Sequence, residues 1–462
     1  MITIVRAHKR KGHGAKIACP ISLLKANVAA ILFVDDTDII HLDMEGCESV
    51  VETHRALQES VRSWGGLLIA SGGALKPIKC FSHILSFAWK RDGMWEYEAN
   101  EEDDSRIILV PTPGEGECAI ANLSADTACE TLGVFTAPNG SAAKALEAMR
   151  EKAGEWVERA TGANLHRRQV WFMLDKQFWP RVAYGLCANT ASWAQLEDCL
   201  QKKYYKLLPI GGIVSSAPTG MRQLDRGFFG AGCPHPGVEC LIAQSNKLIM
   251  HYGCRSGLGL KMQASLELFV IELGLSHQPF LTDYEKHGHL VTHCWLKTLW
   301  EKADRFKIKI TIENVKLPFP KRGDCWLLQA FLRAGYSGER LKRLNRVRIC
   351  MQVNFLSEVL CAKGKTLDRR YLQRRREDER WSMIKFPTEK PPNKDFTLWK
   401  EALYQVAPGG RIADKLGGLV HVGRKTWEWR YVESEHQLRH LHGGGMDIYS
   451  HSTQRQCTNL AN

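Results

Sequence analysis

The feature that most constrains the fold is a pair of adjacent carboxylates between two short apolar runs. Residues 29–34 and 37–42 are rich in β-forming residues, and Asp35 and Asp36 stand between them. Two strands that meet at such a step predict a tight hairpin with both carboxylates at its tip. Mg²⁺ prefers oxygen ligands and usually takes only one or two protein carboxylates. Asp35 and Asp36 are therefore candidate metal ligands.

The segments that follow this hairpin come in a distinctive order. Apolar residues recur at helical spacing over residues 45–64, which predicts a helix. The segment LKPIKC at 75–80 then predicts a turn. Residues 81–89 and 94–98 predict two strands joined by an Asp-Gly turn. The chain thus predicts a hairpin, a helix, a turn and a second hairpin.

This order resembles the palm subdomain of reverse transcriptases. The sequence is most similar to the reverse transcriptases of LINE-like retrotransposons. The residues that carry the resemblance are Phe33-Val34-Asp35-Asp36 and the later motif lysine, Lys79. The resemblance implies RNA-directed DNA polymerisation by two-metal nucleotidyl transfer. It makes Asp35 a ligand of Mg²⁺, Asp36 its carboxylate partner, and Lys79 the group that protonates the departing pyrophosphate. It also implies an RNA template and an RNA/DNA duplex as partners.

The same resemblance places further parts of the polymerase before the Asp-Asp hairpin. These parts are the fingers and a first palm strand with an essential Asp, whereas residues 1–34 contain no Asp or Glu. We therefore expect a 5′-truncated relative that does not polymerise as an isolated chain. An open sheet edge would favour pairing with an upstream polypeptide or with a second copy. A relic without activity and with a poorly closed core is a further interpretation.

The positive charge of the chain is confined to one block. Residues 301–400 contain 25 Lys and Arg and 12 Asp and Glu, which accounts for the whole net charge of +13. Basic residues interleaved with Trp326, Tyr371 and Trp381 are typical of nucleic-acid binding. The other interpretation is a solvated helix face, because acidic residues 377–379 follow at once. The candidate phosphate contacts are Lys342, Arg343, Arg346, Arg369, Arg370, Arg374, Arg375 and Arg376.

This block gives the alternative function. It is a non-catalytic nucleic-acid-binding protein that acts through residues 301–400, in which the Asp-Asp hairpin has no role. Neutralising Arg374, Arg375 and Arg376 would then flatten the salt dependence of binding.

Composition divides the chain into four sections of an α+β protein. Residues 1–100 are the partial palm, and residues 101–130 form an acidic, exposed linker with Pro and Gly. Residues 131–300 are mostly helical and thumb-like. Residues 301–462 are the basic section, with a late hairpin at 419–422 and 426–432. In the helical section, Ser141 and Asn164 each begin a helix, Pro180 interrupts one, and Ser192 with Gln195 forms a capping box.

Cysteine usage bears on the compartment and on zinc. The fifteen cysteines show no regular spacing, which favours reduced thiols in the nucleus or cytoplasm over a secreted, disulfide-linked protein. No run of 18 apolar residues is present, so we expect no membrane partner. One cluster offers thiolate and imidazole ligands, although its spacing matches no common zinc module. It consists of Cys233, His235, Cys240, His251 and Cys254.

Overall fold

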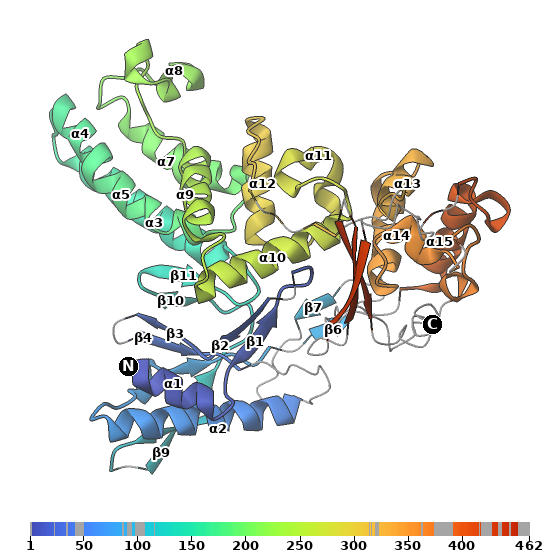
Figure 1. The fold of residues 1–462 in the computed structure, drawn as a ribbon. Coiled ribbons are helices and arrows are strands. Elements are labelled where there is room, and N and C mark those ends of the chain that lie inside the picture. Colours follow the sequence, from blue (N-terminus) through green and yellow to red (C-terminus); the bar gives the residue numbers. More distant parts are fainter. Residues whose placement is uncertain are drawn as a thin grey trace.

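The fold was analysed in a computed structural model, which mixes helices with small sheets, as the predicted α+β class requires (Figure 1). The residues that the structure describes are 2–22, 24–33, 36–41, 50–85, 87–89, 95–97, 107–114, 116–313, 315, 317–318, 323–361, 364–373, 391–414, 416, 427–432, 437–442 and 445–450.

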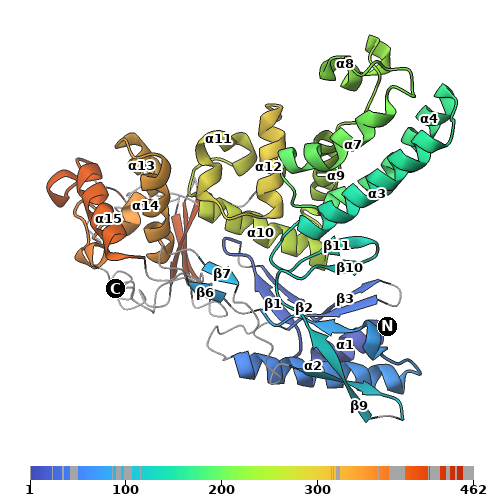
Figure 2. The ribbon, with the colours of Figure 1, turned by 180° about the vertical axis from the view of Figure 1, so that it is seen from behind.

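The N-terminal part combines helices with short strands, most of them paired as antiparallel hairpins (Figures 1 and 2). Its elements are α1 (Ile2–Arg10), β1 (Ala15–Ala18), β2 (Lys25–Val28), β3 (Ala30–Phe33), β4 (Asp36–Ile39), α2 (Val50–Ala70), η1 (Pro77–Lys79), β5 (Phe81–Ser82), β6 (Phe87–Trp89), β7 (Trp95–Tyr97), β8 (Ile108–Thr112), β9 (Gly116–Asn122), β10 (Cys129–Thr131) and β11 (Val134–Thr136).

Both predicted hairpins are present. Strand β3 pairs with β4 in antiparallel register, and β6 pairs with β7. The predicted helix between them is α2, which continues six residues past Trp64 to Ala70. The predicted strand at 81–89 is divided, because β5 is separate from β6 and pairs in parallel with β9. The pattern of β-forming residues predicted these pairings locally but not the parallel contact.

Residues 107–122 differ from the expected exposed linker. They form the hairpin β8–β9, whose inner residues Ile108 and Val110 are buried against α2 with Val61. Gln58 of α2 binds both backbone groups of Leu109, since its Nε2 donates to the carbonyl and its Oε1 accepts from the amide, each at 2.7 Å. The alternating apolar residues of this segment outweigh its acidic start, and residues 101–106 lie outside the described part.

The central part is helical and includes an arm that extends away from the N-terminal sheets (Figure 1). Its elements are α3 (Ala143–Gly162), α4 (Arg167–Met173), η3 (Leu174–Phe178), α5 (Trp179–Ala183), η4 (Leu186–Ala188), α6 (Trp193–Leu196), η5 (Glu197–Gln201), α7 (Lys202–Tyr204), η6 (Tyr205–Leu207), α8 (Thr219–Gln223), η7 (Arg226–Phe228), α9 (Pro236–His251), α10 (Gly257–Leu273), η8 (Pro279–Leu281), α11 (Tyr284–His287), η9 (Gly288–Leu290) and α12 (Trp295–Arg305).

Helix starts in this part agree with the sequence at one of three positions, the capping box of Ser192 and Gln195. The N-cap of α3 is Ala142 and not the predicted Ser141, although Ser141 Oγ accepts a hydrogen bond from the amide of Ala143. Asn164 instead has a left-handed φ of 40°, and α4 begins later, at Arg167. Pro180 does not interrupt its helix. It lies in the first turn of α5, directly after the π-helical turn η3, and a proline without an amide donor is tolerated in the first turn of a helix.

The C-terminal part continues the helical body and ends in a small sheet. Its elements are α13 (Leu327–Arg333), α14 (Gly338–Cys350), η10 (Leu356–Val359), η11 (Arg369–Leu372), α15 (Asn393–Val406), η12 (Pro408–Gly410), β12 (Trp427–Val432), β13 (Gln437–His442) and β14 (Gly445–Ser450). The late strand at 427–432 is present, but it pairs with β13 downstream. The expected partner, residues 419–422, lies outside the described residues.

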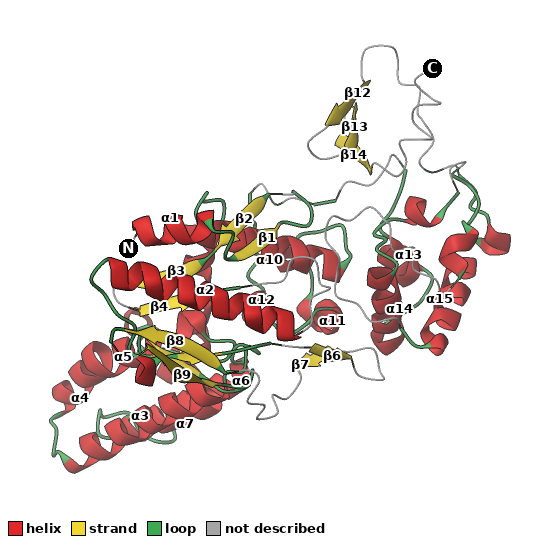
Figure 3. Cartoon of the chain, turned by 90° about the horizontal axis from the view of Figure 1, so that it is seen from below, coloured by secondary structure: helices red, strands yellow, loops and turns green. Residues whose placement is uncertain are grey.

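Two large cores hold the helical body together. One includes buried residues from Leu146 to Cys240, and the other includes buried residues from Leu241 to Leu416. Helix α9 contributes to both. The second core crosses residue 300, so the basic section does not have a separate core from the preceding helices. Figure 3 shows α12 and α11 alongside α10 in this body.

Candidate functional site

The β3–β4 hairpin carries the predicted metal ligands. Its register pairs Phe33 with Asp36, which makes Asp36 the first residue of β4 and not a turn residue. The amide of Ile40 donates to the carbonyl of Ala29 at 3.1 Å and extends the pairing. Asp35 lies outside the described residues, so its geometry is not part of the site described here.

The hairpin lies next to the helical part. Lys261 of α10 is half-buried, and the pKa of its amine is lowered by desolvation, while the nearby charge of Asp38 raises it. Asp38 belongs to β4, two residues after Asp36. The outer strand of the Asp-Asp hairpin and helix α10 are therefore close enough for their charges to interact.

Lys79, the predicted acid, ends the short helix η1. Its side chain is exposed, as is that of its neighbour Ile78. Within the described side chains, no hydrogen bond or ion pair joins Lys79 to the β3–β4 hairpin. The structure thus places the motif lysine on the surface and does not bring it into contact with the carboxylates.

A buried carboxylate that the sequence did not indicate joins the N-terminal sheets to α10. Glu267 Oε2 accepts hydrogen bonds from the amides of Ile21 and Ser22, at 2.7 and 2.9 Å. Gln263, one turn earlier, donates to Ser22 Oγ and to Glu267 Oε1. Glu267 is almost fully buried. Because residues 21 and 22 connect β1 to β2, this helix fixes the position of that hairpin.

Helix α14 holds several of the predicted phosphate contacts in internal ion pairs. Arg343 Nε lies 2.5 Å from Asp395 Oδ1, and Arg346 Nη2 lies 3.6 Å from Asp395 Oδ2. Asp395, in the first turn of α15, has no exposed surface. Arg343 and Arg346 therefore join α14 to α15 through this carboxylate, and their role as phosphate contacts stays a prediction. Lys342 is half-buried.

The second basic cluster is only partly described. Arg370 forms an ion pair with Asp368, with Nη2 and Oδ2 separated by 2.6 Å. Arg369 is exposed. Arg374, Arg375 and Arg376 lie outside the described residues. Within the described part of this cluster, Arg369 thus keeps an exposed charge and forms no ion pair.

The cysteine and histidine cluster does not form a zinc site in the described structure. Cys233 and Cys240 are buried, and burial raises the pKa of each thiol to about 11. Cys240 Sγ donates to a backbone carbonyl, and His235 Nε2 lies 3.2 Å from Glu197 Oε1. Cys254 donates to the carbonyl of the preceding turn. No three His, Cys, Asp or Glu among the described residues form a group that could hold a metal ion, for zinc or for Mg²⁺.

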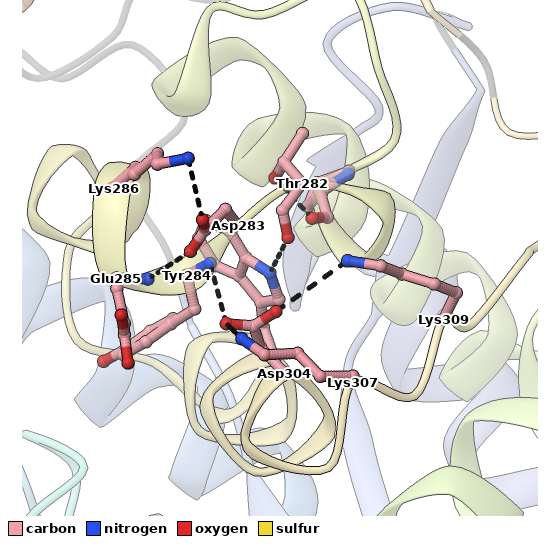
Figure 4. A network of polar contacts seen from close by, with 10 residues as sticks. Thr282, Asp283, Tyr284, Glu285, Lys286, Asp304, Lys307 and Lys309 are labelled. Atoms are coloured by element: carbon pink, nitrogen blue, oxygen red, sulfur yellow. Dashed lines mark hydrogen bonds and ion pairs between the residues drawn. The ribbon is translucent and has the colours of Figure 1, made fainter.

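A polar network surrounds Asp304 near the end of α12, and an apolar cleft lies between the following residues and α9 (Figure 4 shows the network). Asp304 accepts the amide of Tyr284 at 3.3 Å and lies 3.5 and 3.8 Å from the amines of Lys307 and Lys309. Phe306 and Ile308 line one side of the cleft, and α9 lines the other side. The cleft has a volume of about 370 Å³. No charged side chain lines this cleft, so it offers no acid–base chemistry.

Comparison with known proteins identifies no relative. No protein-family model matches the chain, and no curated protein and no solved structure matches it. Among the described residues, no helix is long and apolar enough to cross a membrane.

Proposed function

We propose that the chain is a reverse transcriptase-related retroelement protein that binds a primer–template duplex with its palm-like and thumb-like parts. One observation supports the proposal above the others. The elements β3–β4, α2, η1 and β6–β7 follow one another in the order that the resemblance implies for the palm. The helical arm comes later in the chain, after β8–β11, and corresponds in this proposal to the thumb that the resemblance implies.

In this proposal, the ancestral activity is RNA-directed DNA polymerisation. Asp35 and Asp36 would hold Mg²⁺, which supplies charge neutralisation for nucleotidyl transfer. The exposed Lys79 would stabilise charge on the departing pyrophosphate. Residues 1–34 contain no Asp or Glu that could supply the further metal ligand of the family's first palm strand. We therefore propose that the isolated chain binds the duplex and does not extend the primer.

Binding and extension assays test the two parts of this proposal. A labelled DNA primer annealed to an RNA template should bind, with equal affinity for wild type and Asp35→Ala, and should not be extended when dNTPs and Mg²⁺ are added. Absence of duplex binding would refute the proposed function. Extension that EDTA and Asp35→Ala abolish would refute the inactivity and establish a working polymerase.

The alternative is nucleic-acid binding through residues 301–400 without any role for the hairpin. Internal ion pairs neutralise part of the positive charge of this block, so its surface is less basic than the number of Lys and Arg residues indicates. It would depend on Lys342, Arg369 and residues 374–376. Replacing Arg374, Arg375 and Arg376 with Gln would lower the slope of log K against log salt by about 2.7 if all three contact duplex phosphates. An unchanged slope would indicate that the palm-like and thumb-like parts, and not these arginines, bind the nucleic acid.

A further inference from the structure

Two adjacent phenylalanines lie exposed near the end of the helical arm. Phe228 is 70% exposed and Phe229 is 94% exposed. Phe229 also has a left-handed backbone, with φ of 63°. A bulky residue rarely adopts this conformation, and both the backbone and the exposed ring cost free energy. Strain of this kind persists where the surrounding structure enforces it, and it is concentrated at functional positions.

The loop that carries these rings is tightly constructed. The amide of Gly230 donates to the carbonyl of Asp225 at 3.1 Å, and Asp225 Oδ1 accepts the amide of Gly227 at 2.7 Å. A Cβ at Gly230 would collide with the carbonyl of Leu224. The exposed rings are therefore presented by a closed loop with defined hydrogen bonds.

This loop is joined to α4 by an arginine. Arg226 lies 3.2 Å from Asp175 and covers the ring of Trp171, with 4.9 Å from Cζ to the ring centroid. Trp171 Nε1 in turn donates to the carbonyl of Gly211 at 3.0 Å. We name residues 211–232 together with α4 the arm tip, and Figures 1 and 2 show α4 and α8 at the outer end of the arm.

The arm tip also presents cations. Arg167 and Arg168 begin α4 and are exposed, and in the described part of the chain they form no ion pair. Arg167 lies against the loop, because a Cβ at Gly212 would be 2.7 Å from its Nε. Exposed aromatic rings and exposed cations on the same arm tip match a single nucleic-acid strand, in which bases stack on rings and phosphates bind Arg. Bases within a duplex are already stacked and offer no free face.

We propose that the arm tip binds unpaired nucleotides beside the duplex, with Phe228 and Phe229 stacking on bases and Arg167 and Arg168 contacting phosphates. This inference rests on the proposed function and adds a single-strand site to the duplex site. The protruding rings distinguish the template overhang from paired nucleic acid, independently of sequence.

Two labelled probes test this inference with the full chain. The first is an RNA/DNA duplex with a single-stranded RNA overhang of about 10 nucleotides, and the second is the same duplex with blunt ends. Phe228→Ala with Phe229→Ala should weaken overhang binding about tenfold and leave blunt-duplex binding unchanged. Leucine at both positions should also weaken overhang binding, because leucine keeps an apolar surface but has no aromatic ring to stack on a base.

Matched variants separate the site from general effects. Ile249→Ala removes a side chain on α9 that is 73% exposed, and it should leave both affinities unchanged. Arg167→Gln with Arg168→Gln should reduce the salt slope for the overhang by about 1.4. Urea midpoints equal to wild type would show that the variants fold.

Each outcome of the experiment decides the inference. Unchanged overhang affinity in the double phenylalanine variant overturns it. If overhang affinity is unchanged but the double phenylalanine variant loses the binding of wild type to phosphatidylserine vesicles, the arm tip is assigned to a lipid surface instead. If wild type binds the overhang probe through these rings but does not bind the blunt duplex, the arm tip stands and the proposed duplex-binding function fails.

Discussion

At the scale of single residues, basic composition and basic surface differ in this chain. Arg348 has no exposed surface and donates to the backbone carbonyls of Ile271 and Val353. Burial lowers its pKa to about 10, so the guanidinium stays charged at neutral pH. A buried charge is costly unless hydrogen bonds satisfy it, and these carbonyls do so for Arg348. The fold therefore uses part of its positive charge to join helices.

Arg343 provides a direct test of this structural role. Arg343→Gln removes the closest partner of the buried Asp395, and it should lower the free energy of unfolding by about 3 kcal/mol. Urea unfolding would measure the loss, and affinity for the RNA/DNA duplex should not change. The matched control is Arg369→Gln, at an exposed position, which should stay within about 0.5 kcal/mol of wild type. Weaker duplex binding without destabilisation would instead support Arg343 as a phosphate contact.

At the scale of elements, close approach of helices leaves no room for a methyl group. Gly237 lies in α9 against α6, and a Cβ there would meet the ring of Trp193. Gly237→Ala should therefore cost about 3 kcal/mol through overpacking. Gly154→Ala is the matched control, because this position in α3 has nothing within 4 Å. It should stabilise by about 0.5–1 kcal/mol through helix propensity. Equal effects in thermal unfolding would contradict the packing argument.

Helix α1 is joined to α2 through a buried histidine that should sense pH. His8 Nε2 lies 3.1 Å from Ser60 Oγ, and its ring meets Trp64 edge-on. Burial, with the nearby His13 and Lys11, lowers the pKa of His8 to about 4. The unfolded chain, with an ordinary pKa near 6.5, thus binds more protons between these values. The contribution of His8 to the free energy of unfolding is therefore full above pH 6.5. It falls as the pH drops towards 4, by about 3 kcal/mol in total.

Urea unfolding at several pH values would measure this dependence. His8→Gln keeps a hydrogen-bonding group for Ser60 but does not titrate, so stability should fall less steeply between pH 6.5 and 4. His277→Gln, at an exposed position after α10, should retain the wild-type slope. An unchanged slope in His8→Gln would show that other buried histidines govern the acid response.

At the scale of the whole molecule, local patterns predicted elements better than their long-range contacts. Alternating β-forming residues and the Asp-Gly signal predicted β3–β4 and β6–β7 because hairpins form between neighbours in sequence. Their spacing could not show that the amides of Ile21 and Ser22 bind Glu267, some 245 residues away. Charge counts likewise could not reveal the pairing of Arg343 with Asp395. The polymerase assignment stays a prediction, and so does the role of Asp35.

The long-range junction between Glu267 and the β1–β2 connection can be tested by substitution. Glu267→Gln keeps one acceptor oxygen but loses the charge that binds two amides of the β1–β2 connection, so the hairpin should separate from α10 more often. Hydrogen exchange at Ile21 and Ser22 should accelerate about tenfold or more, since charged hydrogen bonds contribute about 1.5–3 kcal/mol.

Glu272→Gln, five residues along the same helix, is the matched control. Burial raises the pKa of Glu272, and its carboxylate accepts from Thr292 within the helical body. This substitution should leave exchange at Ile21 and Ser22 unchanged. If both variants accelerated exchange equally, loss of any α10 carboxylate would loosen the body, and the junction would not depend on Glu267. Selective acceleration in Glu267→Gln would establish α10 as the element that holds the palm-like hairpins to the helical part, because Glu267, unlike Glu272, accepts hydrogen bonds from the β1–β2 connection.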